Sequence, residues 1–460
     1  MKINIEKIKY AVVKIIAENK NINWQLPYEQ ETPNVGRGTG FFIDKSGYIL
    51  TCAHVVDGAK NLYIEISDSS DKHFCDVIGI CPEFDIALLK TIKYKPKHYL
   101  QLGDSNKIKV RDEVYAVGYP MNFHNSNNVN NIKFTSGIIS GQHKGLIQTD
   151  TPINPGNSGG PLMFKDKVIG INSRKMVSSD ADNIGYSVPI DNYKVIKNDF
   201  TKNHRIIRRP KFGINYSNTN EELIKLLTNN KYKNGIIISK IYNNSMLKKY
   251  NFKEGDILIK IDKYLIDNYG MLDLLWLDSK INIYNILDKY QNNSFINIEV
   301  VRDNKLIKNK VKLIECVNPI RDMYPVFEKI DYLILGAMIF MNFCENHMND
   351  SLYCKYIKYM NSGTSKVICT FIFPNTKVQI LKNINNGDII SKVNDKEINT
   401  ITDFRNALKK PIIINGKEFI KIENDENNII LFTLKELNEI DKNMSINHGY
   451  QTNNNSLKKI

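Results

Sequence analysis

The chain has 460 residues, of which 42% are hydrophobic, 10% aromatic and 24% charged. This length exceeds one ordinary hydrophobic core and predicts about two to four domains, and the composition excludes disordered, collagenous and fibrous proteins. The 63 Lys and Arg outnumber the 49 Asp and Glu, and the formal charge of +14 in principle favours anionic partners. The lysines are scattered along the whole chain without a localised basic face, so we expect no nucleic-acid partner.

Seven cysteines without any CxxC pair predict reduced thiols in a reducing intracellular compartment rather than a disulfide framework. Cys344, His347 and Cys354 are near in sequence but are too few for a tetrahedral site, so we expect no metal. The N-terminus lacks the apolar core and cleavage site of a signal peptide. The longest apolar run, residues 332–343, is shorter than the about 20 residues that span a bilayer, so we expect no membrane span.

The region from about residue 35 to residue 189 consists of short strand-like runs separated by turn residues. Residues 41–43 and 48–51 flank the turn Asp44-Lys45-Ser46-Gly47 and predict a hairpin in which Gly47 takes a positive φ. Many short strands at this spacing predict an all-β barrel or sandwich, and periodicity alone does not decide between the two. The further runs are Leu62 to Ile66, Ile86 to Leu89, Glu113 to Val117, Gly137 to Ile139, Val168 to Ile171 and Tyr186 to Val188.

The pattern becomes helical after residue 190 and then basic up to Pro210, which places a domain boundary near residue 205. Beyond it, residues 234–262 and the segment that contains residues 387–398 share an apolar strand-rich plan around Gly-Asp, which predicts a weak repeat of two α+β modules. The Asn-rich end predicts a frayed or disordered tail. The predicted divisions are residues 1–205, 206–316, 317–437 and 438–460.

The most informative segment is residues 149–162, with the sequence TDTPINPGNSGGPL. A serine hydroxyl is a poor nucleophile by itself, so it needs an adjacent base and amide donors for the negative carbonyl oxygen. The glycines on both sides of Ser158 allow the backbone to bend so that neighbouring N–H groups converge. A plain turn between strands is the alternative interpretation, because short motifs also occur by coincidence.

Two further residues support catalysis by Ser158. His54 follows the predicted hairpin and Asp85 begins an apolar strand. Each residue alone is more often a core histidine or a turn aspartate. The order His, Asp, Ser along the chain is nevertheless the order of chymotrypsin-type double barrels. We therefore predict that Ser158 attacks the carbonyl, His54 accepts its proton and Asp85 orients the imidazole. The N–H groups of Gly156 and Ser158, with Asn157 nearby, would form the oxyanion hole.

These segments occur in the order of the HtrA/Deg serine proteases, which the chain resembles over residues 10 to 200. The resemblance implies a chymotrypsin-like double β-barrel protease followed by two PDZ-like domains, and it extends to the plant-type Deg subgroup through Trp24-Gln25-Leu26-Pro27 and residues 324–337. It also implies a trimer-based homo-oligomer. The matching segments are Leu50 to Val56, Phe84 to Lys90, Val110 to Pro120, Thr135 to Ser140, the serine loop and Asn183 to Pro189.

The resemblance also suggests where substrates bind. The substrate pocket would be lined by Pro152, Ile153, Ser173 and Arg174, although a cation there would need a partner. Cys52 stands where Asn is frequent in the family and would be a packing change. In the first module, residues 212–214 (Phe212, Gly213 and Ile214) are either the loop that captures a peptide carboxylate or a plain strand start. No comparable loop is clear in the second module, which would mediate assembly instead.

We therefore expect an ATP-independent serine endopeptidase that cleaves unfolded or damaged polypeptides and uses no cofactor, since no phosphate-binding Gly-Lys-Ser/Thr loop occurs. A non-proteolytic peptide-binding scaffold or chaperone with an inactive triad is the alternative. Loss of casein digestion in Ser158→Ala separates the two. A nucleic-acid-binding protein is a third possibility and predicts salt-sensitive binding to DNA or RNA.

Overall fold

A computed structural model describes residues 4–20, 22–29, 33–120, 132–173, 184–201, 205–348, 353–360 and 363–450. The chain forms two compact units. The first comprises Met1–Asn19 and Asn34–Val317, and the second comprises Lys20–Pro33 and Asn318–Ile460.

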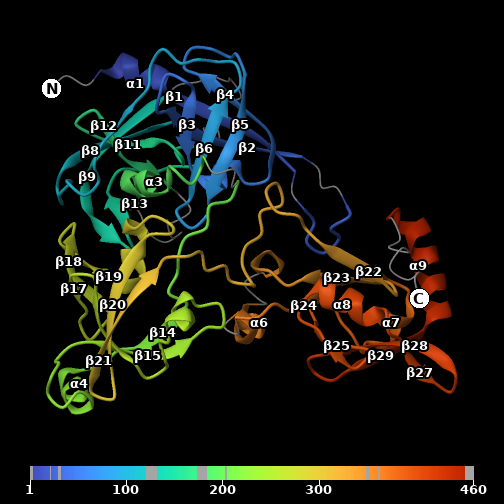
Figure 1. Cartoon of the computed structure of the whole chain (residues 1–460). Helices are drawn as coiled ribbons and strands as arrows, with labels where there is room; N and C mark the ends of the chain where they lie inside the picture. The colour runs from blue at the N-terminus through green and yellow to red at the C-terminus, as the bar shows by residue number, and fades with distance from the viewer. Residues whose placement is uncertain are drawn as a thin grey trace. The chain divides into compact units, whose positions relative to one another are not determined.

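The first unit begins with a closed barrel whose strands follow the order β1-β2-β3-β6-β5-β4 (Figure 1). Its fully buried side chains include Ile15, Phe41 and Leu50. The predicted hairpin is confirmed, and Gly47 has a φ of +93°. The elements are α1 (Ile5–Ala11), β1 (Val12–Asn19), β2 (Asn34–Phe42), β3 (Tyr48–Thr51), α2 (Ala53–Val56), β4 (Ala59–Ile66), β5 (His73–Cys81) and β6 (Ile86–Thr91).

A second sheet of the first unit has the order β11-β8-β9-β10-β13-β12-β7. An additional pairing of β11 with β12 closes this sheet into a ring of strands. The barrel alternative of the sequence analysis is therefore confirmed. The elements are β7 (Gln101–Leu102), β8 (Glu113–Gly118), β9 (Lys133–His143), β10 (Leu146–Thr149), β11 (Pro161–Phe164), β12 (Lys167–Asn172), β13 (Gly185–Pro189) and α3 (Ile190–Ile196).

The rest of the first unit is a six-stranded sheet, β14-β15-β16-β20-β21 with β17 beside β16, and a separate β18-β19 hairpin. The hairpin contacts the second barrel, because Leu277 joins its apolar cluster and Trp276 Nε1 donates to the carbonyl of Ser105 at 2.9 Å. Ile236, Ile238 and Ile257 of this sheet are buried. The elements are β14 (Ile214–Ser217), α4 (Glu221–Leu227), β15 (Ile236–Ile241), η2 (Met246–Tyr250), β16 (Ile257–Ile261), β17 (Tyr264–Leu265), β18 (Met271–Trp276), β19 (Ser279–Asn282), α5 (Ile283–Ile286), η3 (Leu287–Lys289), β20 (Phe295–Arg302) and β21 (Lys305–Lys312).

The second unit contains an eight-stranded sheet with the main order β22-β23-β24-β25-β28-β27. The early segment around Trp24 also belongs to this unit: Thr370 Oγ1 donates to the carbonyl of Gln25 at 3.1 Å, and the Trp24 and His347 rings lie 5.3 Å apart. The elements are β22 (Tyr332–Leu335), β23 (Met338–Asn342), η4 (Glu345–His347), α6 (Tyr353–Met360), β24 (Val367–Ile372), α7 (Lys377–Leu381), β25 (Ile389–Val393), β26 (Lys396–Glu397), α8 (Ile401–Leu408), β27 (Ile412–Ile414), β28 (Lys417–Asn424), β29 (Ile429–Thr433) and α9 (Leu434–His448).

Helix α9 differs from the frayed tail that the sequence predicts from residue 438. Thr433 caps its N-terminus, and Gly449 ends it with a φ of +67°. Leu437 and Asp441 are buried, and Asp441 Oδ1 accepts a hydrogen bond from the N–H of Gly336 at 2.7 Å. The expectation of disorder is therefore wrong for residues 438–448, because a polar composition conceals these two anchoring side chains.

Within the described part of the chain, no helix is both long and apolar enough to cross a membrane.

Candidate active site

His54 lies on the short helix α2, directly after the β2-β3 hairpin of the first barrel. The helix is only four residues long, and Ala53, Val55 and Val56 are buried around the histidine. The side chain of His54 is 30% exposed. The apolar neighbours therefore fix the backbone of His54 while one side of the imidazole remains accessible.

Asp85 lies in the turn between β5 and β6, where its N–H donates to the carbonyl of Pro82 at 3.2 Å. Its φ of +55° is in the left-handed region, which is uncommon for residues other than glycine. The buried carboxylate accepts hydrogen bonds from His54 Nδ1 at 2.8 Å, from the N–H of His54 at 3.0 Å and from Ser173 Oγ at 2.7 Å. Local backbone geometry and these donors together direct the carboxylate at the imidazole.

The charge of Asp85 determines which nitrogen of His54 carries the proton. Burial by itself raises the pKa of Asp85, but the hydrogen bonds from His54 and Ser173 outweigh burial and hold this pKa below its usual value. An ionised carboxylate only accepts hydrogen bonds, so Nδ1 must donate. The lone pair of a neutral imidazole is then on Nε2, where it can accept a proton.

Ser158 lies in the loop between β10 and β11, and this loop is held against both barrels. Its carbonyl accepts a hydrogen bond from the N–H of Thr39 on β2 at 2.9 Å, while Gly159 N–H donates to Asn172 of the second barrel at 2.8 Å. Gly159 has a φ of +86°, and a Cβ there would lie 2.1 Å from Thr51 Oγ1. Only glycine fits this position, so the predicted need for glycine beside the serine has a steric cause.

The Gly156 peptide is oriented by a buried threonine. Thr39 Oγ1 donates to the carbonyl of Gly156 at 2.6 Å and accepts from the N–H of Tyr119 at 2.9 Å. Gly156 itself has a φ of +97°. The N–H of Asn157 is already bonded, to the carbonyl of Asn154 at 3.0 Å. Asn157 therefore contributes to the turn through its N–H, and Gly156 and Ser158 remain the predicted amide donors.

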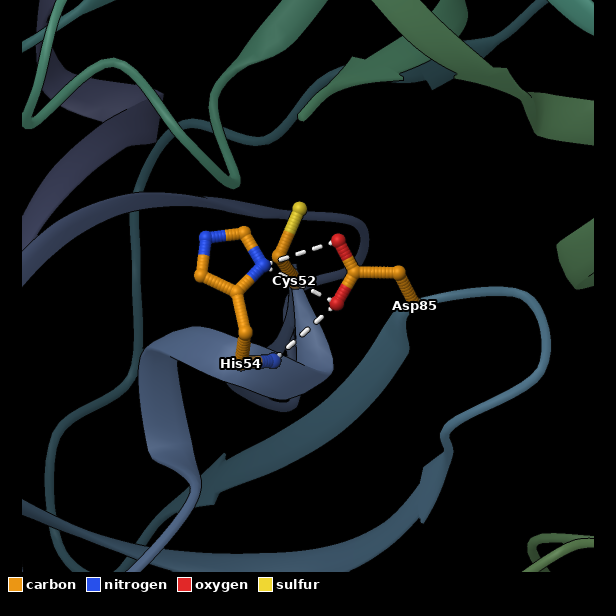
Figure 2. Close-up of side chains that lie close together, drawn as sticks. All are labelled: Cys52, His54 and Asp85. Carbon is orange, nitrogen blue, oxygen red and sulfur yellow. Dashed lines mark hydrogen bonds and ion pairs between the residues drawn. The ribbon is translucent and has the colours of Figure 1, made fainter. Parts of the chain in front are cut away.

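Cys52, His54 and Asp85 offer ligand atoms within 4.8 Å of one another and could hold a metal ion (Figure 2). Their hydrogen bonds fit a different chemistry, because Nδ1 of His54 is bonded to Asp85 and the Cys52 thiol donates to the carbonyl of Asn172 at 3.2 Å. Burial raises the pKa of Cys52 well above its usual value, which keeps the thiol protonated. A protonated thiol is a poor metal ligand, so this arrangement fits an Asp–His pair better than a metal centre.

The residues predicted for the substrate pocket have different surroundings. Pro152 is exposed and Ile153 is half-buried, and a Cβ on Gly185 would lie 2.9 Å from Ile153 Cδ1. The hydroxyl of the buried Ser173 faces Asp85 rather than a pocket. Arg174 lies outside the described residues. The role of Ser173 as a donor to Asp85 was missed because residue 173 is 88 positions away in the chain.

In the predicted carboxylate loop, Phe212 and Ile214 are buried and Gly213 has a φ of +64°. A Cβ on Gly213 would lie 2.9 Å from Cα of Ser245, so glycine is needed for this close approach. In the second unit, the thiol of Cys344 lies 3.2 Å from His347 Nδ1, while Cys354 is exposed.

Comparisons with known proteins give consistent results. The family model of the trypsin-like peptidase domain matches residues 38–171. A relative from Buchnera aphidicola (subsp. Baizongia pistaciae), "Probable periplasmic serine endoprotease DegP-like", is 30% identical over 395 residues, which cover 82% of this chain and 75% of the relative. "Putative protease Do-like 14" from Arabidopsis thaliana is 32% identical over 268 residues, or 52% of this chain and 60% of that protein.

A solved structure, "HtrA-type protease AlgW with decapeptide", is 22% identical and has a TM-score of 0.51 over 68% of this chain and 97% of its own. This similarity supports the trypsin-like fold with its β-barrel sheets. Assignment to the plant-type subgroup stays a prediction.

The expected reducing intracellular compartment is wrong in light of the relatives. Those from Buchnera aphidicola, Rickettsia prowazekii, Marinomonas and Pseudomonas putida are all named as periplasmic. All seven cysteines are free, and all except Cys354 are buried. Buried thiols are shielded from oxidants, so an odd number of unpaired cysteines did not identify the compartment.

Proposed function

This chain belongs to the HtrA/Deg family of serine proteases and is a serine endopeptidase, and we propose that it cleaves unfolded polypeptides with His54, Asp85 and Ser158 as its catalytic triad. One observation carries the proposal: the buried, ionised carboxylate of Asp85 accepts a hydrogen bond from the protonated Nδ1 of His54 at 2.8 Å. A histidine held in this tautomer is what a serine nucleophile requires as its base.

In the proposed reaction, Ser158 Oγ attacks the carbonyl carbon of the scissile peptide bond while its proton moves to Nε2 of His54. Asp85 stabilises the imidazolium that forms. The negatively charged oxygen of the tetrahedral intermediate accepts hydrogen bonds from the N–H groups of Gly156 and Ser158. His54 then returns the proton to the leaving amine, the acyl-serine forms, and water releases the second product by the same steps in reverse order.

We propose that the substrate is an extended peptide segment, bound beside Pro152 and Ile153 at the edge of the serine loop. Thr135 Oγ1 donates to the carbonyl of Pro152 at 3.3 Å, which supports the backbone of this edge. A half-buried Ile153 favours an aliphatic residue before the cleaved bond. Arg174 stays a proposed pocket residue, and Ser173 is proposed to hold Asp85.

The two C-terminal modules are proposed to be PDZ-like, with boundaries at 206–316 and 317–437. In the first, β14 lies at the edge of its sheet, so a peptide could add beside it with its carboxylate at Phe212, Gly213 and Ile214. In the second, β23 is already paired on both sides, with β22 and β24, which supports a role in assembly. We also propose a trimer-based homo-oligomer, which the family resemblance implies, and an extracytoplasmic location, which the relatives' names indicate.

Digestion of casein by the wild type and by Ser158→Ala tests the proposal. The wild type should release peptides without ATP, and Ser158→Ala should lose this activity while retaining its fold. A pure, folded wild type that stays inactive on denatured casein would favour the non-proteolytic scaffold. Activity that persists in Ser158→Ala would place the nucleophile elsewhere.

A further inference from the structure

The connection between the second barrel and the first module passes along the strand that leads to Asp85. The N–H of Ile80 on β5 donates to the carbonyl of Arg205 at 2.8 Å, and the N–H of Ile207 donates back to Ile80 at 2.8 Å. Arg208 lies 3.6 Å from the carboxylate of Glu83. The connection is therefore attached to β5 immediately before the turn that carries Asp85.

Arg209 of this connection is buried, with 3% of its surface exposed. Its guanidinium donates to the carbonyl of Leu287 at 3.0 Å, to the carbonyl of Tyr290 at 2.6 Å and to Asn292 Oδ1 at 2.7 Å. The two carbonyls lie in the last turn of the α5-η3 segment, where a cation is favourable. Arg209 thus anchors one end of a helical segment of the first module.

The other side of the same guanidinium contacts the turn of Asp85. Its Cζ lies 4.9 Å from the ring centroid of Phe84, the residue directly before Asp85, in a cation–π arrangement. Phe84 is itself 6% exposed. Because Asp85 has a φ of +55°, its backbone conformation must be maintained by surrounding contacts. The Phe84 ring under Arg209 is such a contact.

We propose that Arg209 is a positioning residue for Asp85, which links the end of the α5-η3 segment to the turn that carries the catalytic carboxylate. This inference rests on the proposed triad. A buried arginine is costly unless its donors are paired. Here both terminal nitrogens donate to groups of the first module, whereas Nε has no hydrogen-bond partner and the ring of Phe84 lies against the guanidinium. Loss of the guanidinium therefore loosens Phe84 and displaces Asp85 relative to His54, without touching the peptide-binding edge.

The test compares Arg209→Met and Arg209→Lys with Arg205→Met in the full chain. Arg205 is in the same connection, and its side chain is exposed, so its substitution is a matched control. With a fluorogenic peptide, Arg209→Met should lower kcat by about 10- to 100-fold, the loss that accompanies a displacement of about 1 Å, with KM unchanged within about twofold. Arg209→Lys should recover part of this loss, and Arg205→Met should match the wild type.

Assays are made at a temperature where circular dichroism shows each variant fully folded. If Arg209→Met does not fold, Phe84→Leu removes the ring that transmits the contact and should also lower kcat at constant KM. Equal kcat values for folded Arg209→Met or Phe84→Leu and the wild type would overturn the inference. Ser158→Ala separates the two proposals: full activity in that variant refutes the triad, whereas a dead Ser158→Ala beside a normal Arg209→Met refutes only the positioning role.

Discussion

Replacing Asp85 by asparagine should change the protonation of His54 rather than the shape of the site. Aspartate and asparagine have the same shape, but one oxygen becomes an NH2 group. If the NH2 replaces Oδ2, it points at His54 Nδ1, 2.8 Å away, and at the hydroxyl of Ser173, 2.7 Å away. If it replaces Oδ1, it faces the backbone N–H of His54, 3.0 Å away, and two donors oppose each other. The first orientation is therefore favoured.

In that orientation Nδ1 of His54 must accept a hydrogen bond, so the proton of the neutral imidazole moves to Nε2. Nε2, the proposed acceptor of the Ser158 proton, then carries a proton and cannot act as a base. In a well-studied protease of this type the same change lowers kcat by about 10⁴-fold, which corresponds to about 5 kcal/mol of transition-state free energy. We expect a loss of this size for Asp85→Asn, with KM nearly unchanged because no group that binds substrate is altered.

The assay is steady-state hydrolysis of a fluorogenic peptide at pH 8, with Asp191→Asn as the control. Asp191 is also a hydrogen-bonded carboxylate of the protease region, since it accepts from Ser105 Oγ at 2.6 Å and from Lys194 Nζ at 2.8 Å. Asp191→Asn should retain kcat. A kcat for Asp85→Asn within about tenfold of the wild type would refute the assignment of the tautomer, and with it the role of Asp85.

Three further predictions use the same geometry. Ser173→Ala removes a charge-assisted hydrogen bond to Asp85 and should lower both the free energy of unfolding, by about 1.5 to 3 kcal/mol, and kcat. Ser105→Ala removes the equivalent hydrogen bond to Asp191 and should lower the free energy of unfolding by a similar amount without lowering kcat. Denaturant titration measures the first quantity and steady-state kinetics the second. Gly159→Ala should abolish activity, because its Cβ would lie 2.1 Å from Thr51 Oγ1, and a retained kcat would contradict this steric argument. The hydrogen bonds to Asp85 hold the pKa of its carboxyl below the usual 3.8, so the stability that the ionised carboxylate contributes is complete above that pH and is lost as the pH falls further. Below pH 4, the melting temperature should therefore fall more steeply with pH for the wild type than for Asp85→Asn.

The local features of the protease region could be predicted from the sequence because each is encoded within a few residues. The turn at Gly47 and the bend at Gly159, beside Ser158, both have a positive φ. A short stretch of sequence is enough to predict this conformation, because glycine adopts it readily. The order of His54, Asp85 and Ser158 along the chain indicated the double barrel. In the structure, Asp85 and His54 lie in direct contact, as that order implies.

The contacts between distant segments could not be predicted in this way. Ser173 was expected in the pocket, but its hydroxyl faces Asp85, and only the closing of the two barrels against each other brings these residues together. Arg209 belongs to the basic segment that predicted a domain boundary near residue 205, and its burial against Phe84 depends on the docking of the first module. The ordering of α9 likewise depends on two buried side chains, Leu437 and Asp441, and Asp441 is bonded to a residue 105 positions away.

The central claim is that Ser158 is a nucleophile activated by His54. A fluorophosphonate probe tests it directly, because Ser158 Oγ would form a bond to phosphorus while fluoride leaves and His54 takes the proton. Peptide mass spectrometry of the labelled full chain should find the adduct on Ser158 and a greatly reduced labelling rate in His54→Ala. Absence of any adduct on Ser158 in folded wild type under these conditions would contradict the account.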